Sequence, residues 1–553
     1  MFDGSLRVKL IIIGGVAGGA SAAARARRID ESADILMVER GPDVSFANCG
    51  LPYHIGGIIP KRDALLVSTA DRLRERFRLE VRTRTEAVAI NRDAKTVRLK
   101  DLTTGIATDV PYDRVILAPG AAPIRPAISG VDRPNVFTLR TLSDTDRIKA
   151  AVDRGARRAV IVGGGFIGLE LAENFIHRGL SVTLIDRNPQ LLAPFDAEMT
   201  EPLRQLLLAK GVDIRFNGSV SAIHGDDASL IATMTDGSTV AADLIVLGIG
   251  VSPENQLAKE AGLAVGPRGG IVVDEHLRTS DPHIFAVGDA IETDEFDTAE
   301  RTQIPLAGPA NRQGRIAADN ALGRSVRYRG TQGTAIIGVF DRIAAMTGRS
   351  EKVLRRRGTP YRKAYIHPAH HAGYYPGAEG MTLKLLFEPT EGRILGAQGI
   401  GGAGVDKRID IIAMAIQGRM SVFDLEESEL CYAPQFGSAK DPVNMLGFVA
   451  AGLIRGDHPQ IDWETVLADP QAGLLLDVRT PGEFASGHVP GAINIPVDEL
   501  RNRIKELSKD RPIRAYCQVG QRGYIATRLL IQSGFHTANI GGGYRTYLLH
   551  RPH

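Results

Sequence analysis

Two glycine-rich turns, roughly 150 residues apart, constrain the fold of this chain more than any other feature. Each turn follows a short apolar segment, Leu10–Ile13 or Ala159–Val162, and precedes a helix-forming segment, Ala20–Ile29 or Leu169–Arg178. Glycines in such a turn let the backbone approach a pyrophosphate at a helix N-terminus, where unpaired N–H groups favour anions. The repeat therefore predicts two dinucleotide-binding βαβ modules in an α/β fold.

The two turns differ in how completely they follow the G-x-G-x-x-G pattern. The second turn has all three glycines, Gly163, Gly165 and Gly168. The first keeps Gly14 and Gly19 but has Val16 at the middle position. An acid at a strand end, Glu39 or Asp186, follows 18 to 20 residues after the last glycine of each turn. Such a carboxylate accepts hydrogen bonds from ribose hydroxyls and repels a 2′-phosphate. One turn alone could serve packing, but two with acids in register favour nucleotide binding.

Composition narrows the partners that a chain of 553 residues can have. The formal net charge is only +3, which gives no reason to expect a nucleic acid or a membrane surface as partner. Hydrophobic residues make up 43%, enough for several cores, so disorder is excluded as the main state.

Three cysteines in this length cannot form a disulfide framework and fit a reducing compartment. No secretory signal is recognised at the start, and the apolar stretch Leu10–Ala24 is too short to span a bilayer. We expect a soluble, cytoplasmic protein.

A third segment, Thr279–Asp289, is a short apolar strand that ends in Gly288-Asp289. With it, residues 7 to about 450 resemble the two-dinucleotide flavoprotein disulfide reductases, in which this Gly-Asp closes on the flavin ribityl and phosphate. The resemblance implies FAD on the first module and NAD(P)H on the second. Asp186 favours NADH over NADPH, although Arg187 beside it could soften that preference.

The same resemblance implies the residues that bind the cofactors. Ala118-Pro119-Gly120 matches the family's usual Ala-Thr-Gly, with Pro in place of Thr, and Ile245–Ile249 with Gly250 matches its second glycine strand. The expected FAD residues are Gly14, Gly15, Ala17, Gly18, Gly19, Glu39, Arg40, Val88, Ala118, Pro119, Gly120, Gly288, Asp289, Pro305 and Ala310. The expected NAD residues are Gly163, Gly165, Phe166, Ile167, Gly168, Asp186, Arg187 and Gly250. No metal site is expected.

Cys49, in the segment Ser45–Tyr53, is the expected catalytic thiol. A cysteine at or near a helix N-terminus has its thiolate favoured by the helix dipole. Most disulfide reductases have a second cysteine five positions later, but this chain has His54 there. A dithiol is therefore excluded at this place, and the thiol must cycle through a mixed disulfide, a persulfide or a sulfenic acid. The alternative interpretation is a buried structural cysteine.

The string Ser-Phe-Ala-Asn-Cys-Gly-Leu-Pro-Tyr resembles the coenzyme A-disulfide reductases, in the single-cysteine branch that also holds NADH oxidases and peroxidases. That resemblance implies CoA contacts from Ser21, Arg25, Arg28, Ser45, Asn48, Arg76, Asn311 and Lys440. Arg25 and Arg28 lie one helical turn apart and could bind the phosphates of CoA. The alternative for these two is a solvated basic helix face.

The resemblance further implies a homodimer in which two tyrosines of the partner subunit approach the thiol. Here they would be Tyr432 and Tyr374, the latter preferred over Tyr375. A phenol near a thiolate could protonate a leaving sulfur. Cys431 stands where a small apolar residue is usual, and we expect it to pack, with a second reactive thiol as the alternative.

The C-terminal part resembles a single rhodanese domain, through Asp477–Phe484 and Gly487–Pro496. Its active loop would be Cys517–Gly523, where successive backbone N–H groups and Arg522 stabilise a thiolate or persulfide. Cys517 and Arg522 are therefore expected catalytic residues. The predicted domains are FAD-binding (1–150 and 276–330), NAD(P)H-binding (151–275), α+β dimerisation (331–450), linker (451–460) and α/β rhodanese (461–553).

These features together predict a homodimeric FAD enzyme that uses NADH to reduce CoA persulfide, polysulfide or CoA disulfide. The fused rhodanese domain favours a persulfide or polysulfide, because a reductase of plain CoA disulfide gains nothing from it. The alternatives are an NADH oxidase or peroxidase that cycles Cys49 through sulfenic acid, and a non-catalytic redox sensor or sulfur-relay scaffold.

Overall fold

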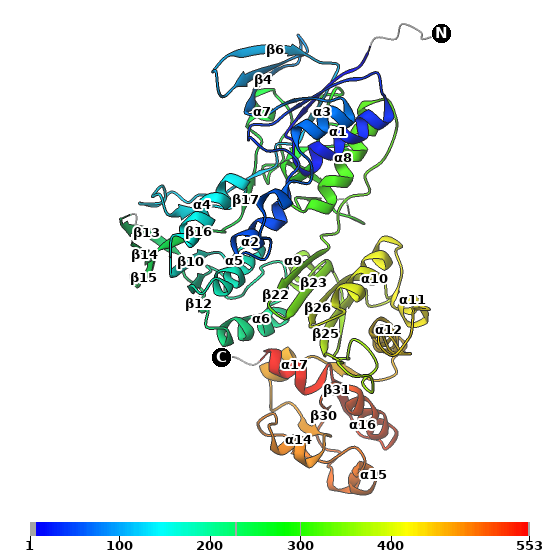
Figure 1. The fold of residues 1–553 in the computed structure, drawn as a ribbon. Coiled ribbons are helices and arrows are strands. Elements are labelled where there is room, and N and C mark those ends of the chain that lie inside the picture. Colours follow the sequence, from blue (N-terminus) through cyan, green and yellow to red (C-terminus); the bar gives the residue numbers. More distant parts are fainter. Residues whose placement is uncertain (1–6, 227–228, 299, 551–553) are drawn as a thin grey trace. The chain divides into compact units, whose positions relative to one another are not determined.

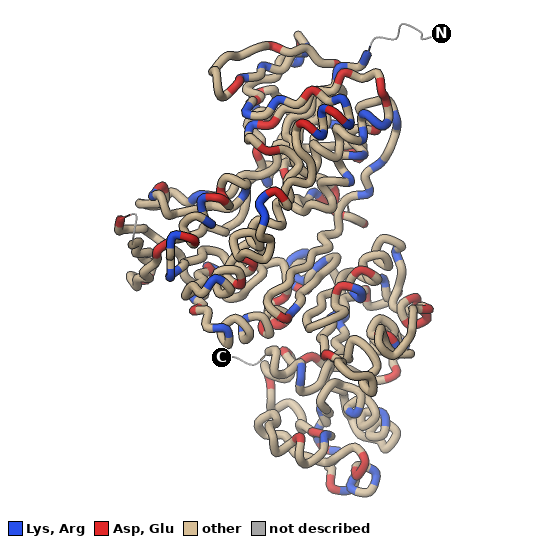
Figure 2. The backbone as a smooth tube through the Cα atoms, viewed as in Figure 1, with Lys and Arg blue, Asp and Glu red and all other residues tan. Residues whose placement is uncertain are grey.

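The structure is a computed structural model that describes residues 7–226, 229–298 and 300–550. Residues 1–6 of the predicted first domain and 551–553 of the last lie outside this description. The chain divides into two units, one of residues up to 189 with 208–332, the other of 190–207 with 333 onward. In both units positive and negative residues are interspersed along the chain (Figure 2).

The first unit begins with a parallel sheet in the order β19-β7-β1-β2-β3. Its strands are β1 (Lys9–Ile13), β2 (Asp34–Val38), β3 (Glu80–Arg82), β7 (Arg114–Leu117) and β19 (Ile284–Ala286). Helices α1 (Ala17–Ile29) and α8 (Ala307–Ala321) lie side by side (Figure 1). The two helices are so close that a Cβ on Gly314 would lie 2.2 Å from the carbonyl oxygen of Gly18, so their packing requires glycine at this position.

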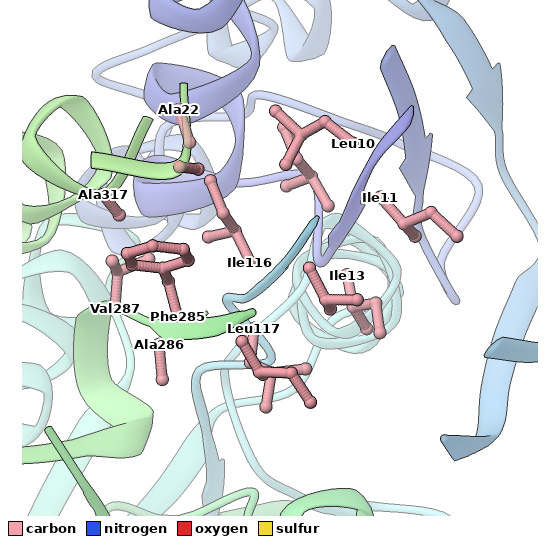
Figure 3. Close-up of a cluster of buried hydrophobic side chains, with 14 of the residues drawn as sticks. Leu10, Ile11, Ile13, Ala22, Ile116, Leu117, Phe285, Ala286, Val287 and Ala317 are labelled. Atoms are coloured by element: carbon pink, nitrogen blue, oxygen red, sulfur yellow. The ribbon is translucent and has the colours of Figure 1, made fainter. Parts of the chain in front are cut away.

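The core of this sheet consists of aliphatic side chains from strands that are distant in sequence (Figure 3). Strand β1 contributes Leu10, Ile11 and Ile13, and they pack with Ile116 and Phe285 from β7 and β19. Since these positions are buried along consecutive residues, the strands read as continuous apolar runs, as central parallel strands do.

The second glycine turn belongs to another parallel sheet, in the order β12-β11-β10-β16-β9. Its elements are β9 (Val136–Phe137), α4 (Leu142–Asp153), β10 (Arg158–Val162), α5 (Phe166–His177), β11 (Ser181–Ile185), β12 (Asp213–Arg215) and β16 (Leu244–Leu247). The smaller elements of the first unit are α2 (Leu51–Ile55), α3 (Ala70–Phe77), β4 (Thr85–Asn91), β5 (Thr96–Asp101), β6 (Ala107–Pro111), β8 (Ala121–Pro123), β13 (Val220–Gly225), β14 (Leu230–Met234), β15 (Thr239–Ala242), β17 (Val251–Pro253), α7 (Gln256–Glu260), β18 (Ile271–Val272), β20 (Ile291–Asp294) and β21 (Arg301–Thr302).

The second unit holds an antiparallel sheet in the order β22-β23-β26-β25-β24. Its elements are α6 (Ala197–Ala209, of which residues up to 207 belong here), β22 (Ala335–Val339), β23 (Arg342–Gly348), α9 (Glu351–Arg357), β24 (Arg362–Ile366), β25 (Met381–Phe387), β26 (Ile394–Gly401), α10 (Val405–Gln417), α11 (Val422–Glu427) and α12 (Pro442–Arg455). The predicted linker 451–460 is wrong in its first half, because α12 continues to Arg455. Asp441 caps this helix at its start, and Gly456 ends it in the left-handed conformation.

The C-terminal part of the same unit is a parallel sheet in the order β27-β31-β30-β28-β29. Its elements are β27 (Gln460–Ile461), α13 (Trp463–Ala468), β28 (Leu474–Asp477), α14 (Pro481–Ala485), β29 (Ile493–Asn494), α15 (Leu500–Arg503), β30 (Ile513–Tyr516), α16 (Gln521–Gln532), β31 (Thr537–Ile540) and α17 (Gly543–His550).

This C-terminal sheet is docked on the antiparallel one through polar contacts. The Lys363 ammonium on β24 donates to Glu464 on α13 at 2.7 Å. His367 Nε2 lies 2.8 Å from the hydroxyl of Thr546 on α17, and burial lowers the pKa of this imidazole to about 3. Because both contacts are at least partly buried, they fix the two sheets relative to each other.

Candidate active site

The first glycine turn has the geometry of a phosphate cradle. A Cβ on Gly14 would lie 2.0 Å from the carbonyl oxygen of Ala118, so only glycine lets the turn pass the end of β7. The Gly15 N–H donates to Glu39 at 2.8 Å, which places the predicted ribose acceptor beside the turn. Helix α1 then begins at Ala17, and neither a side-chain cap from the described residues nor an acid occupies its first turn. An uncapped N-terminus of this kind suits a pyrophosphate, and the residues fit FAD.

The second turn repeats this arrangement, with more free space around its middle glycine. A Cβ on Gly163 would meet the carbonyl oxygen of Gly248 at 2.2 Å, and the Gly164 N–H donates to Asp186 at 2.6 Å. At Gly165, where α5 starts, a Cβ would meet no described atom within 4 Å. The backbone is therefore accessible to a ligand at this point, and the residues fit a nicotinamide dinucleotide. Phe166, Ile167 and Gly168 form the first turn of α5, and Arg187 is exposed after β11.

The other predicted cofactor residues are spread over several elements of the first unit. Pro119 and Gly120 follow β7, and Gly250 precedes β17. Gly288 and Asp289 lie in a short 3₁₀ turn after β19, where burial raises the pKa of Asp289. Val88 lies in β4, Pro305 is exposed, and Ala310 and Gly18 are buried in α8 and α1. Arg40 donates to Glu254 at 2.8 Å, so its charge is already paired.

Cys49 lies in a 3₁₀ turn, Asn48–Gly50, directly before α2. All three cysteines of the chain fall among the described residues and are unpaired, with Cys49 exposed. The surrounding protein still disfavours a charge here: partial desolvation and the carboxylates of Glu170 and Asp289 raise the pKa of Cys49. The expected stabilisation of the thiolate by the helix dipole is therefore outweighed by desolvation and by the charges of these two acids, and α2 has only five residues.

Glu170 is a residue that the sequence analysis missed. It lies in the second turn of α5, and burial raises its pKa to about 7. Its Oε1 accepts a hydrogen bond of 3.4 Å from Tyr53, four residues after Cys49. The string Phe-Ile-Gly-Leu-Glu could have indicated it, because this acid follows the last glycine of the second turn by two positions.

The predicted CoA residues fall into two sets. Ser21 donates to Asn311 at 2.5 Å across α1 and α8, so the structure brings this pair together from 290 positions apart. Arg28 is exposed with its charge accessible, whereas Arg25 donates to Asp319 at 2.8 Å. Arg25 is thus less available for a phosphate than Arg28. Of the remaining residues, Asn48 donates to the Arg140 carbonyl at 3.3 Å, Ser45 has a left-handed φ of 48°, and Arg76 and Lys440 are exposed.

The two predicted tyrosines meet in the second unit. The hydroxyl oxygens of Tyr374 and Tyr432 are 2.8 Å apart, and both side chains are exposed. The hydrogen bond with Tyr432 raises the pKa of Tyr374. Cys431 is exposed as well, so the prediction that it packs in this chain is wrong. It lies in the irregular segment between α11 and α12.

The C-terminal sheet carries the second predicted thiol. Cys517 is fully buried at the end of β30, and the Gly520 N–H donates to its sulfur at 3.1 Å. Arg522 lies beside it but forms a bidentate pair with Glu483, at 2.7 Å for both contacts. This pair lowers the pKa of Glu483 to about 2. The loop therefore supplies the expected amide donor, while the nearby guanidinium is shared with a carboxylate.

Asp196, Glu198 and Glu351 form a cluster that could offer three ligands to a metal ion. The ammonium of Lys384 lies between them, at 2.9, 2.6 and 2.5 Å. Burial alone would lower the pKa of this lysine, but the carboxylates raise it well above its usual value. The Lys384 ammonium thus occupies the position that a metal ion would take among these carboxylates.

Comparison with known proteins assigns each part of the chain to a family model. A model described as pyridine nucleotide-disulphide oxidoreductase matches residues 8–314, the dimerisation domain of that family matches 334–441, and a rhodanese-like domain matches 463–550. Coenzyme A disulfide reductase of Staphylococcus epidermidis is 34% identical over 444 residues, which are 80% of this chain and 99% of that protein.

Two solved structures extend the similarity to the C-terminal sheet. Reduced Bacillus anthracis CoADR-RHD is 46% identical, with a TM-score of 0.96 and 99% of both chains covered. The NAD-dependent persulfide reductase from A. fulgidus is 35% identical, with a TM-score of 0.91 over 98% of this chain and 100% of that one. Among the described residues, no helix has the length and apolar character needed to span a membrane.

Proposed function

Because the chain belongs to the pyridine nucleotide-disulphide oxidoreductase family, we propose that it is an FAD- and NADH-dependent reductase of sulfur–sulfur bonds carried by coenzyme A. The substrates would be CoA persulfide, polysulfide or CoA disulfide. The observation that carries this proposal is the unpaired Cys49, whose exchange partner must come from outside the chain, together with a second thiol, Cys517, on a rhodanese-like domain.

In this reaction the Cys49 thiolate attacks the CoA-bound sulfur of a CoA persulfide, which forms a mixed disulfide and releases hydrosulfide. Bound FAD would supply the redox chemistry, by accepting a hydride from NADH and delivering two electrons to Cys49. Two electrons and one proton then restore the Cys49 thiolate and release the CoA thiol. Tyr432 and Tyr374 of a second copy of the chain would donate the proton to the leaving sulfur.

Cys517 would handle sulfane sulfur. Its thiolate attacks the sulfane sulfur of a donor such as thiosulfate or polysulfide, which breaks the donor's S–S bond, releases sulfite or a shortened polysulfide and leaves a persulfide on Cys517. A CoA thiolate then attacks the terminal sulfur to give CoA persulfide and the Cys517 thiolate. This step supplies the substrate of Cys49 and explains why the two domains are joined.

The finer assignments rest on single features. Asp186 beside the second turn supports NADH over NADPH. The match to a dimerisation domain supports a homodimer, and Arg28, Lys440 and the Ser21–Asn311 pair support CoA binding. The three cysteines support a reducing, cytoplasmic location.

Anaerobic NADH consumption with each sulfur substrate tests the proposal, with air or hydrogen peroxide as the competing oxidant. We expect turnover with CoA persulfide or polysulfide that is lost in Cys49→Ser while FAD is retained. Fast consumption with oxygen or peroxide alone would instead assign an NADH oxidase or peroxidase. Fast turnover with CoA disulfide and none with persulfide or polysulfide would refute the role given to the rhodanese-like domain. A mass adduct of CoA on Cys49 in the purified protein would identify the thiol partner directly.

A further inference from the structure

A buried ion pair joins the two segments that carry Tyr374 and Tyr432. Arg408 lies on α10 and is 1% exposed. Its guanidinium donates to both carboxylate oxygens of Asp441, at 3.2 and 2.7 Å. Asp441 is 2% exposed and also accepts from the Val443 N–H at 3.0 Å, at the start of α12. A bidentate pair of this kind fixes orientation as well as distance.

The same guanidinium also contacts the other tyrosine segment. Its Nη2 donates to the carbonyl oxygen of His370 at 2.8 Å, four residues before Tyr374. A second link runs from the Ala372 N–H to the carbonyl oxygen of Gly437 at 2.9 Å. Arg408 therefore lies where the two segments converge and contacts the backbone of one and the side chain of the other.

The tyrosines themselves have little packing to hold them. Tyr374 is 76% exposed and Tyr432 48% exposed, yet their hydroxyls are 2.8 Å apart. Because exposed side chains are not fixed by neighbours, this short distance depends on the backbone of the two segments. Lys440, one of the cations expected to bind CoA, directly precedes Asp441 and depends on the same anchor.

We infer that Arg408 is a positioning residue, whose contacts with Asp441 and His370 hold Tyr374 and Tyr432 together as one proton-donating pair for the thiol chemistry. The inference rests on the proposed function, since the pair matters for turnover only if the tyrosines act at Cys49 of the partner. A buried ion pair is often no more stabilising than apolar residues of the same volume. We therefore expect Arg408 to fix the relative position of the two tyrosine segments and to add little to the free energy of unfolding.

The main test variant combines Arg408→Met with Asp441→Asn. This double variant leaves no unpaired buried charge, and asparagine still caps α12. Lys407→Gln is the matched control, because Lys407 is the next residue, is 35% exposed and lies 3.8 Å from the same carboxylate. If the double variant does not fold, Arg408→Lys replaces it, because one ammonium cannot reproduce the guanidinium contacts with both segments.

Two readouts are needed. In anaerobic NADH oxidation with CoA persulfide, we expect kcat to fall roughly 10- to 100-fold in the double variant, as for a small misplacement of a reacting group. Lys407→Gln should stay close to the wild type. Adding Tyr432→Phe to the double variant should cost less than about twofold more, although the same change in the wild type costs roughly tenfold or more. Independently of turnover, ¹³C NMR of ζ-labelled tyrosine, assigned with Tyr374→Phe, should show the pKa of Tyr374 falling toward its ordinary value.

The outcomes separate the two proposals. If Tyr374→Phe and Tyr432→Phe both keep the wild-type kcat, the role of the tyrosines in the proposed function is wrong, and the NMR titration alone decides on Arg408. If these variants are slow but the double variant keeps both its rate and the raised pKa of Tyr374, the positioning role of Arg408 is overturned. A fall in rate together with a lowered Tyr374 pKa supports it.

Discussion

The phenolic oxygen of Tyr53 lies 3.4 Å from Oε1 of Glu170, although the two residues are 117 positions apart. Burial, together with the charge of Glu173, raises the pKa of Tyr53 to about 12 and that of Glu170 to about 7. The pair therefore brings a carboxyl group that titrates near neutrality to the helical segment that follows Cys49.

Replacing Glu170 should make the Cys49 thiolate easier to form. Together with burial, the Glu170 charge raises the pKa of Cys49, so Glu170→Gln should lower that pKa. The measurement is the rate of iodoacetamide alkylation across pH 6 to 10, followed on the Cys49 peptide by mass spectrometry. Cys431 in the same sample is the internal control. An unchanged midpoint at Cys49 would refute the electrostatic link.

The same substitution should change how stability depends on pH. The folded-state pKa of Glu170, about 7, exceeds the value of about 4.3 expected for an unfolded chain. Its contribution is thus fully present below pH 4 and is lost as pH rises through 7. Thermal unfolding should show Glu170→Gln gaining on the wild type between pH 5.5 and 8, by up to about 2 kcal/mol. A difference that stays constant over this range contradicts the assigned titration.

Lys384→Met should destabilise the second unit strongly. The substitution removes the cation shared by the buried carboxylates of Asp196, Glu198 and Glu351, of which Glu351 keeps its contact with Lys363 at 3.0 Å, at a cost of about 3–5 kcal/mol. The pKa values of Glu198 and Glu351 lie below their usual range. Their stabilising contribution is therefore present above the unfolded pKa, and the difference from wild type should shrink in acid. Urea unfolding at pH 7 and pH 4 measures both effects, with the partly exposed Lys407→Met as control.

Glu483→Gln should release Arg522 toward the Cys517 loop. Glutamine retains the capping box with Thr480, so α14 stays capped. The freed guanidinium should lower the KM for an anionic sulfur donor such as thiosulfate, by roughly three- to tenfold. Glu499→Gln, which removes one of the two carboxylates paired with Arg503 on α15, is the control for an acid-to-amide change elsewhere in the domain. Equal KM values in both variants and the wild type would show that Arg522 does not act on the donor.

Asp186→Asn should weaken the discrimination against NADPH. Asp186 accepts from the N–H groups of Gly164 and Asn188, contacts that an amide oxygen can partly replace, but the amide does not repel a 2′-phosphate. The ratio of kcat/KM for NADH to that for NADPH should fall by roughly tenfold. If the ratio is unchanged, another residue sets the preference.

Strands with continuous apolar runs between turn residues could be predicted well from the sequence. The predicted segments Leu10–Ile13 and Ala159–Val162 are strands in the structure, and each strand begins one residue earlier, at Lys9 or Arg158. Helix starts were less accurate: α1 begins at Ala17 instead of Ala20, because Gly18 is already helical where α8 packs against it. That packing depends on Gly314, almost 300 positions later.

Residues that act through tertiary contacts could not be found in this way. In the sequence, nothing distinguishes Arg408 from an exposed helix arginine, because its partners Asp441 and His370 are 33 and 38 positions away. Arg25 and Arg522 were expected to have free charges, but Asp319 and Glu483 reach them from distant segments. The spacing of residues along the chain indicates turns and strands. The ion pair that a charged side chain forms depends on the tertiary structure, which places its partner beside it.

The contact between Lys363 and Glu464 makes the stability of the antiparallel sheet depend on the C-terminal domain. A chain cut after Arg455 would remove two carboxylates from the Lys363 ammonium, those of Asp462 and Glu464, and would take away the Thr546 hydroxyl that contacts the imidazole of His367. Deleting the domain should therefore lower the free energy of unfolding of the sheet that remains, because two of its buried side chains would lose their partners.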